Sequence, residues 1–393
     1  DPARAERLEV LRAAELDARG AFGTDGRRNL DAIEELAAAD PELGSLITVQ
    51  PRSADDLRAL LHGDETLLEF YGHGEQLYVV TAGTAGVELS RLDGAGLVDD
   101  VRDLREAIDS GEPWRELSRS LYDRLLKPVA SRLRTPRLVI VPHGVLHYLP
   151  FAALDDGEQM LIDRFRIRVL PNTSVIPFLN DADAQGSALV LGNPDRGDPG
   201  LDLPGAEREA LAISEVLTDA RIRLRGDASE SALRGQGQQF RIVHIASHGQ
   251  FRPDSPLSSR LLLAGDDRND GDLTAAELYT MRLSAELVTL SACETGLGEV
   301  ASGDDVLGLT RGFLYAGADS VLASLWEVDD AATAMLMSAF YRHLGSTDRA
   351  DALRRAQLET RERYPDAFFW AAFQLVGAAG GDRRLAAATA AAL

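Results

Sequence analysis

The sequence contains a single cysteine, Cys293, among its 393 residues. One cysteine cannot form a disulfide within the chain, and a zinc site built from several thiolates is excluded as well. A lone thiol is typical of a reducing compartment, where it serves either as a small buried hydrophobe or as a candidate nucleophile. The residues around Cys293 must therefore decide between these two roles.

Basic residues are also scarce, since 41 Lys and Arg stand against 63 Asp and Glu and give a net charge of -22. A surface of this sign repels phosphate backbones, so we expect no direct contact with nucleic acid. It would attract basic peptide segments. For the charge as a whole we prefer the interpretation that it is a solvated acidic surface.

No run of apolar residues approaches the roughly 20 that a membrane-spanning helix needs. Residues 1–20 are charged and lack the apolar core of a signal peptide. We therefore expect a cytoplasmic protein without membrane contact. The chain does not begin with Met, which indicates trimming or a longer parent chain. With 45% hydrophobic and 26% charged residues, the composition is that of a globular protein, and the length suits about two or three domains.

The periodicity of the sequence divides the chain into four parts. Residues 1–51 have helical spacing, residues 52–186 and 187–377 form two blocks in which strands and helices alternate, and residues 378–393 are an alanine-rich tail. In the first block, a meander of strands at a sheet edge is expected from position 66 onward. The alternation predicts an α/β fold with a mostly parallel sheet and helices on both faces.

Two of the apolar runs of the second block end in reactive groups. His248 and Gly249 follow the run in IVHIASHGQF, and Cys293 follows the run in VTLSACETGLG. Because loops at the carboxyl ends of parallel strands meet at one sheet edge, we expect the imidazole and the thiol to come within hydrogen-bond reach. The imidazole would take the thiol proton, and the N–H groups of Gly249 and Cys293 would form an oxyanion hole.

Caspase-like peptidases share a strand ending in His-Gly and a later strand ending in Ala-Cys. More narrowly, the chain resembles the CHAT family over about residues 52–377. The blocks that carry the resemblance occur in family order: LVIVPHGVLHYLPFAAL (138–154), LPGAEREA (203–210), VHIASHGQF (243–251), LSACETGLG (290–298), SGDDVLGL (302–309), FLYAGADSVLASLWEVDD (313–330), ALRRAQL (352–358) and FWAAFQLVG (369–377).

The resemblance implies a caspase-like fold with an inactive pseudo-caspase half at 52–186 and an active half at 187–377. It implies a cysteine endopeptidase of a signalling or defence response, with a Cys-His dyad, a protein substrate and neither a cofactor nor a metal. Relatives are often fused to helical repeats that receive a signal. Since only the segment 1–51 stands in that position here, we expect activation by an upstream helical region or by a separate partner.

The segment SLWEVDD (324–330) is the candidate specificity pocket. Asp329 or Asp330 suits the N-cap of the helix that follows. In separase, a more distant relative, the matching strand end helps to form an acidic pocket for arginine, so the resemblance implies that Asp330 contacts an Arg or Lys before the scissile bond. An apolar pocket walled by Trp326 is the alternative. Glu294 lines a subsite or bonds to a neighbouring loop.

The other histidines and serines suit structural roles better. His244 lies within a strand and is expected to be a hydrogen-bonded core residue, and His143 and His147 belong to the first block, which has no cysteine. Neither Ser247 nor Ser291 lies in a G-x-S-x-G elbow.

Two other functions compete with peptidase activity. In the first, the chain is a catalytically idle scaffold for protein contacts, which would need neither member of the dyad. In the second, it binds a nucleotide. The sequence has neither a G-x-G-x-x-G after its first strand nor a phosphate-binding loop, which disfavours the second.

Overall fold

The computed structural model describes residues 37–47, 52–179, 186–217, 219–236, 240–252, 255–295 and 304–380. Within these ranges only the backbone is described at 47, 235–236, 293–295 and 304–307. The helices predicted before residue 37 and the alanine-rich tail beyond residue 380 lie outside the described residues.

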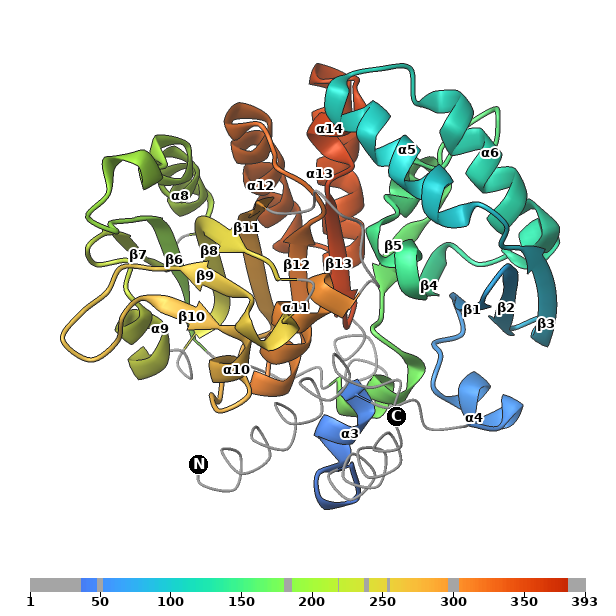
Figure 1. The fold of residues 1–393 in the computed structure, drawn as a ribbon, viewed down its shortest axis with the longest axis horizontal. Coiled ribbons are helices and arrows are strands. Elements are labelled where there is room, and N and C mark those ends of the chain that lie inside the picture. The colour runs from blue at the N-terminus through green and yellow to red at the C-terminus, as the bar shows by residue number, and fades with distance from the viewer. Residues whose placement is uncertain are drawn as a thin grey trace, which may run out of the picture.

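One mixed sheet runs through the described part of the chain (Figure 1). Its 13 strands are β1 (Glu65–His73), β2 (Gln76–Gly83), β3 (Gly86–Asp93), β4 (Arg137–Val141), β5 (Arg166–Val169), β6 (Ser187–Pro194), β7 (Ala220–Arg225), β8 (Phe240–Gln250), β9 (Arg260–Leu262), β10 (Asp272–Thr274), β11 (Leu287–Thr295), β12 (Ser320–Ser324) and β13 (Phe373–Gly377). The order is β10-β9-β8-β11-β12-β13-β5-β4-β1-β2-β3, and β6 pairs with both β7 and β8.

The α-helices of the described residues are α3 (Pro41–Ile47), α4 (Ala54–Ala59), α5 (Leu97–Ser110), α6 (Arg115–Leu125), α7 (Leu161–Arg164), α8 (Pro204–Val216), α9 (Glu230–Gln236), α10 (Ala275–Leu278), α11 (Asp304–Ala316), α12 (Asp330–Leu344), α13 (Arg349–Arg363) and α14 (Ala367–Trp370). Short 3₁₀ turns are η1 (Lys127–Arg132), η2 (Gly144–Tyr148), η3 (Phe151–Ala153), η4 (Thr173–Phe178), η5 (Pro199–Leu201) and η7 (Pro256–Ser258).

The sheet is buried on both faces, as its apolar runs predict. In β4, Leu138 and Ile140 join the core under α5, α6, α8, α12, α13 and α14, while Val139 and Val141 join the opposite core under α3, α9, α10 and α11. The alternation follows from the two-residue period of a strand. The predicted α/β class, with a mostly parallel sheet and helices on both faces, is confirmed, and so is the meander β1-β2-β3 at one edge.

The two blocks run in opposite directions through the sheet, which the sequence did not predict. β13 is antiparallel to β12 and parallel to β5, and β8, β11 and β12 are mutually parallel. The carboxyl ends of β4 and β5 therefore lie at the edge opposite to those of β8 and β11. An alternation of strands and helices does not specify the direction of each strand.

Polar contacts join the first block to α13. Between β5 and β13 the paired residues are Val169 and Val376. Arg354 of α13 donates to the carbonyls of Ile162 and Asp163, each at 2.7 Å, and thus ties this helix to the first block.

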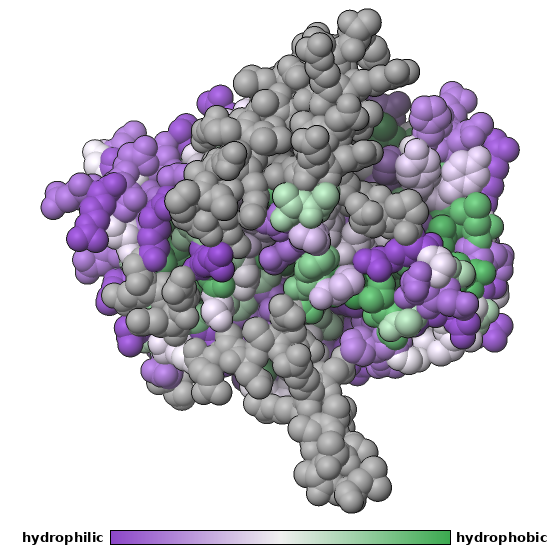
Figure 2. All heavy atoms as spheres, turned by 90° about the horizontal axis from the view of Figure 1, so that it is seen from below, coloured by the Kyte–Doolittle hydropathy of each residue, from purple (hydrophilic) through white to green (hydrophobic). Residues whose placement is uncertain are grey.

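The surface seen from below carries mainly hydrophilic residues among those described, with a few apolar patches (Figure 2). Among the described helices, none has the length and apolar character that crossing a membrane requires.

Candidate active site

His248 and Cys293 occupy matching positions on neighbouring strands. β8 and β11 pair in parallel, and their register places the Cα of Cys293 opposite that of His248 and the Cα of Glu294 opposite that of Gly249. Register partners project to the same face of a sheet, so the two candidate residues share a face as well as an edge. The two Cα atoms thus lie side by side at one sheet edge. That the imidazole and the thiol come within hydrogen-bond reach stays a prediction.

Both residues lie inside strands rather than on the loops that the sequence suggested. β8 continues to Gln250 and β11 to Thr295, because β9 adds to the free edge of β8 and pairs Leu262 with His248 and Leu261 with Gly249. The backbone of Gly249 therefore lies between two strands, β9 and β11. The side chains of Cys293 and Glu294 lie outside the described residues.

The imidazole of His248 has an uncommitted nitrogen. Its Nε2 atom is buried and has no hydrogen-bond partner among the described residues. A buried imidazole nitrogen normally finds a partner, so such an atom calls for an explanation. In the tautomer that carries its proton on Nδ1, this nitrogen can accept a proton from a neighbouring group.

His244 is a core residue, as predicted. It is fully buried, and its Nδ1 lies 3.0 Å from the hydroxyl of Tyr341 on α12. Its Nε2 lies 3.2 Å from Oε1 of Glu209, within ion-pair distance although not in hydrogen-bond geometry. The hydroxyl of Ser291 donates to the other oxygen of Glu209 at 2.9 Å.

The sequence analysis missed Glu209. A signal was present, because Glu209 shares the buried stripe of α8 with Ala210 and Ile213. A carboxylate on an apolar stripe is rarely left without a partner.

The histidines of the first block lie away from the pair. His143 follows β4, whose carboxyl end is at the opposite edge of the sheet, and its ring lies 5.1 Å from that of Tyr71. His147, in η2, is buried. Burial, with the nearby charge of Arg311, lowers the pKa of His147 to about 3.

The low pKa of His147 predicts loss of stability in acid. The unfolded chain binds a proton at this residue below pH 6.5, whereas the folded chain binds it only near pH 3. Stability should therefore fall by about 1.4 kcal/mol per pH unit between these values. Urea unfolding at several pH values in this window gives the slope of the free energy of unfolding against pH. In His147→Leu this slope should be smaller by the contribution of one bound proton, about 1.4 kcal/mol per pH unit. Val145→Ala, which removes a buried neighbour without a titrating group, should keep the wild-type slope, and an unchanged slope in His147→Leu would contradict the assignment.

The acidic residues of the specificity segment have separate roles in the fold. Asp329 is the N-cap of α12 and accepts from the backbone N–H groups of Ala331 and Ala332, which confirms the predicted cap. Asp330 follows it, with its side chain 57% exposed and Oδ2 lying 3.2 Å from Nη2 of Arg208 on α8. Its carboxylate also lies against Gly205, where an added Cβ would come within 2.0 Å of Cγ.

Trp326 is packed into the fold. Its indole Nε1 donates to the carbonyl of Phe368 at 3.0 Å, and the guanidinium of Arg105 lies 6.0 Å from its ring. Arg105 also donates to the carbonyl of Leu325 at 2.6 Å. The structure thus uses Trp326 as a buried anchor for the segment after β12.

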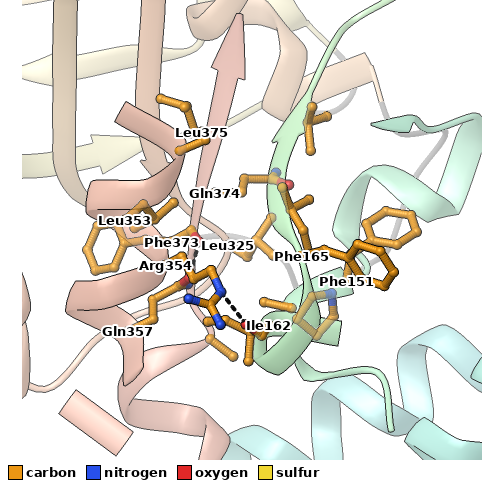
Figure 3. Close-up of a pocket in the computed structure, with 16 residues that line it drawn as sticks. Phe151, Ile162, Phe165, Leu325, Leu353, Arg354, Gln357, Phe373, Gln374 and Leu375 are labelled. Atoms are coloured by element: carbon orange, nitrogen blue, oxygen red, sulfur yellow. Dashed lines mark hydrogen bonds between the residues drawn. The ribbon is translucent and has the colours of Figure 1, made fainter. Parts of the chain in front are cut away.

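An apolar pocket lies beside this segment, at the junction of the two blocks (Figure 3). It lies between β5, β13 and α13. Leu325 borders it together with Phe165 and Phe373, whereas Trp326 is not among its lining residues. An apolar subsite next to β12 would therefore be built around Leu325.

The fold is of the caspase-like α/β class. The separase of Saccharomyces cerevisiae, solved in a complex with securin, superposes with a TM-score of 0.53 at 12% identity, over 88% of this chain and 31% of that chain. At this identity the likeness concerns the fold alone. The chain belongs to the CHAT domain family, whose sequence model matches residues 115–378.

Two curated relatives are similar in sequence. Tetratricopeptide repeat protein 28 of Homo sapiens is 28% identical over 323 residues, and that of Mus musculus is 28% identical over 325 residues. Each alignment covers 66% of this chain, and the chain spans only 13% of the length of these relatives.

Proposed function

We propose that the chain is a cysteine endopeptidase that cleaves protein substrates with Cys293 as nucleophile and His248 as base. The observation that carries the proposal is the register of β8 and β11, which pairs the Cα atoms of these two residues at the carboxyl ends of parallel strands. Nε2 of His248, which has no hydrogen-bond partner among the described residues, supports it. Membership of the CHAT family and the separase-like fold agree with it.

In this mechanism His248 takes the proton of the Cys293 thiol, and the thiolate attacks the carbonyl carbon of the scissile bond. The N–H groups of Gly249 and Cys293 are the proposed donors to the oxyanion. Collapse of the tetrahedral intermediate breaks the C–N bond, and His248 returns the proton to the leaving amine. Water then hydrolyses the thioester and restores the thiol.

A peptide library of diverse sequence provides the direct test. Incubation with the chain should produce new termini that share a residue pattern and that are absent when Cys293→Ala is used. The chain covers only a small part of relatives that are named for tetratricopeptide repeats. We therefore extend the proposal to regulation: a helical upstream region or a partner protein raises a low basal activity, and the test should be repeated with such a segment.

The competing proposal is a catalytically idle scaffold, and thiol labelling distinguishes the two. If the dyad is active, Cys293 should react with an electrophile faster in the wild-type chain than in His248→Ala, because the thiolate is the reactive species. Equal labelling rates in the two proteins would favour the scaffold.

For specificity, we keep Asp330 as the contact for Arg or Lys before the scissile bond. A substrate arginine would replace Arg208 at the carboxylate, and this exposed pair is weak enough to be exchanged. Asp330→Asn should lower kcat/KM for an arginine peptide, relative to a matched leucine peptide, by about 10- to 100-fold, because a charge-assisted hydrogen bond is lost. Kinetics on the two peptides measure this ratio.

Asp329→Asn is the matched control. Asparagine caps a helix as well as aspartate does, so the helix is kept, and the substitution removes one negative charge at the position next to Asp330. It should leave the arginine-to-leucine ratio unchanged. A wild-type preference for leucine would instead assign the apolar pocket beside Leu325 to the substrate, and an arginine preference that survives Asp330→Asn would remove Asp330 from the specificity site.

A further inference from the structure

Three register pairs of β8 and β11 carry polar groups along one face of the sheet. Thr289 is paired with His244, Ser291 with Ala246 and Cys293 with His248. Their spacing of two residues places them on a common face, which is the face covered by α8 and α12. We call these three pairs the ladder, and the proposed catalytic pair is the last of them along both strands.

Glu209 of α8 contacts both strands of the ladder. Glu209 as a whole is only 5% exposed, and its Oε2 accepts from Ser291, two residues before Cys293. Its Oε1 lies 3.2 Å from Nε2 of His244, four residues before His248. One buried carboxylate therefore connects the strand of the nucleophile with the strand of the base.

The hydrogen-bond network also indicates which nitrogen of His244 donates to Tyr341. The hydroxyl of Tyr341 donates to Thr289 at 2.8 Å, and burial raises the pKa of Tyr341, so this hydroxyl stays a donor. Nδ1 of His244 must then donate to Tyr341. Nε2 of His244 is left facing the Glu209 carboxylate at 3.2 Å, with no hydrogen-bond partner among the described residues.

The backbone brings α8 close enough for this contact. A Cβ at Gly192 of β6 would come within 2.7 Å of the Cβ of Ala210 and 3.0 Å of the carbonyl of Ala206. Glycine at this position therefore allows α8 to lie directly on the sheet. Ala246, which lies between β6 and β11 at the level of Gly192 and Ser291, adds no bulk below the helix.

We infer that Glu209 is a positioning residue for the proposed Cys293–His248 pair, which it serves by fixing β8 and β11 to each other beneath the pair. This inference rests on the proposed function. A shift of about 1 Å between two reacting groups can cost up to a hundredfold in rate, so a contact two residues below the thiol is close enough to matter.

The test uses the rate of iodoacetamide alkylation as a function of pH. Because the chain has one cysteine, the rate reports on Cys293 alone. A thiol paired with an imidazole remains reactive at and below neutral pH, whereas a free thiol, with a pKa of about 8.5, does not. Glu209→Ala should slow alkylation about tenfold in the neutral and acidic range and move the profile toward that of His248→Ala. A loss of global stability alone would lower the melting temperature without moving the profile.

Two variants serve as controls. Glu209→Gln can still accept from Ser291 and donate to His244, so it should retain most of the wild-type profile. Glu215→Ala removes an exposed glutamate from the same helix and should leave the profile unchanged. If Glu209→Ala does not fold, Ser291→Ala replaces it, with a smaller shift expected in the same direction.

The inference is overturned if Glu209→Ala, or Ser291→Ala in its place, melts cooperatively and keeps the wild-type profile while His248→Ala loses it. A shifted profile in a chain that cleaves no peptide would refute the peptidase function and leave the positioning role standing. If His248→Ala itself keeps the wild-type profile, there is no pair to position and both proposals fail.

Discussion

Replacing Cys293 with alanine should abolish peptide cleavage, and replacing His248 with alanine should do nearly the same. The two Cα atoms are register partners on adjacent parallel strands. If they act as one unit, removing either member removes the covalent route, and kcat should fall by roughly 10⁶-fold. Steady-state kinetics on a peptide selected from the library would measure the loss, and circular dichroism would show that each variant is folded.

Ser247→Ala is the matched control for the dyad variants. Ser247 precedes His248 and, by strand alternation, belongs to the other face of the sheet; its hydroxyl donates to the carbonyl of His248 at 3.2 Å. Its loss should change kcat/KM by less than about tenfold, the size of one neutral hydrogen bond. Wild-type turnover by Cys293→Ala on any peptide would refute the proposed mechanism outright.

The largest effect on stability is expected from the ion pair of Glu65 and Arg168. These side chains are 1% and 6% exposed, and the guanidinium makes two contacts with the carboxylate, at 2.9 and 3.1 Å. Arg168 also donates to the carbonyl of Gly377 at 3.1 Å and so ties β13 to the first block. Arg168→Met should destabilise the chain by about 3–5 kcal/mol, because Glu65 would remain as a buried charge without its partner.

Urea denaturation would measure this loss, and the double variant Glu65→Leu/Arg168→Met should recover much of it because no charge is left unpaired. Lys127→Met is a suitable control, since it breaks an exposed pair with Asp123 at 2.9 Å. Its effect should stay below about 1 kcal/mol. Equal effects of Arg168→Met and Lys127→Met would show that the buried pair of Glu65 and Arg168 contributes no more to stability than an exposed pair.

The sequence was sufficient for those features that depend on local pattern. Short continuous apolar runs predicted the buried strands, and the order of the family blocks predicted the caspase-like class that the fold confirms. The N-cap at Asp329 could also be predicted, because a cap depends on the N–H groups two and three residues further along. His244 was placed in the core because it lies within an apolar run.

Other features depend on contacts between distant parts of the chain, and only the tertiary structure decided them. The reversal of the first block relative to the second is set by the pairing of β13 with β12 and with β5. The second of these pairings joins Val376 to Val169, which lies 207 positions earlier. The extension of β8 past His248 requires β9 to lie beside it.

The network beneath the candidate pair has the same origin. Ser291 meets Glu209 across 82 residues, and His244 meets Tyr341 across 97. In sequence each of these is an ordinary polar residue next to apolar ones. Their partnership arises because folding removes them from water, and buried polar groups must then find one another.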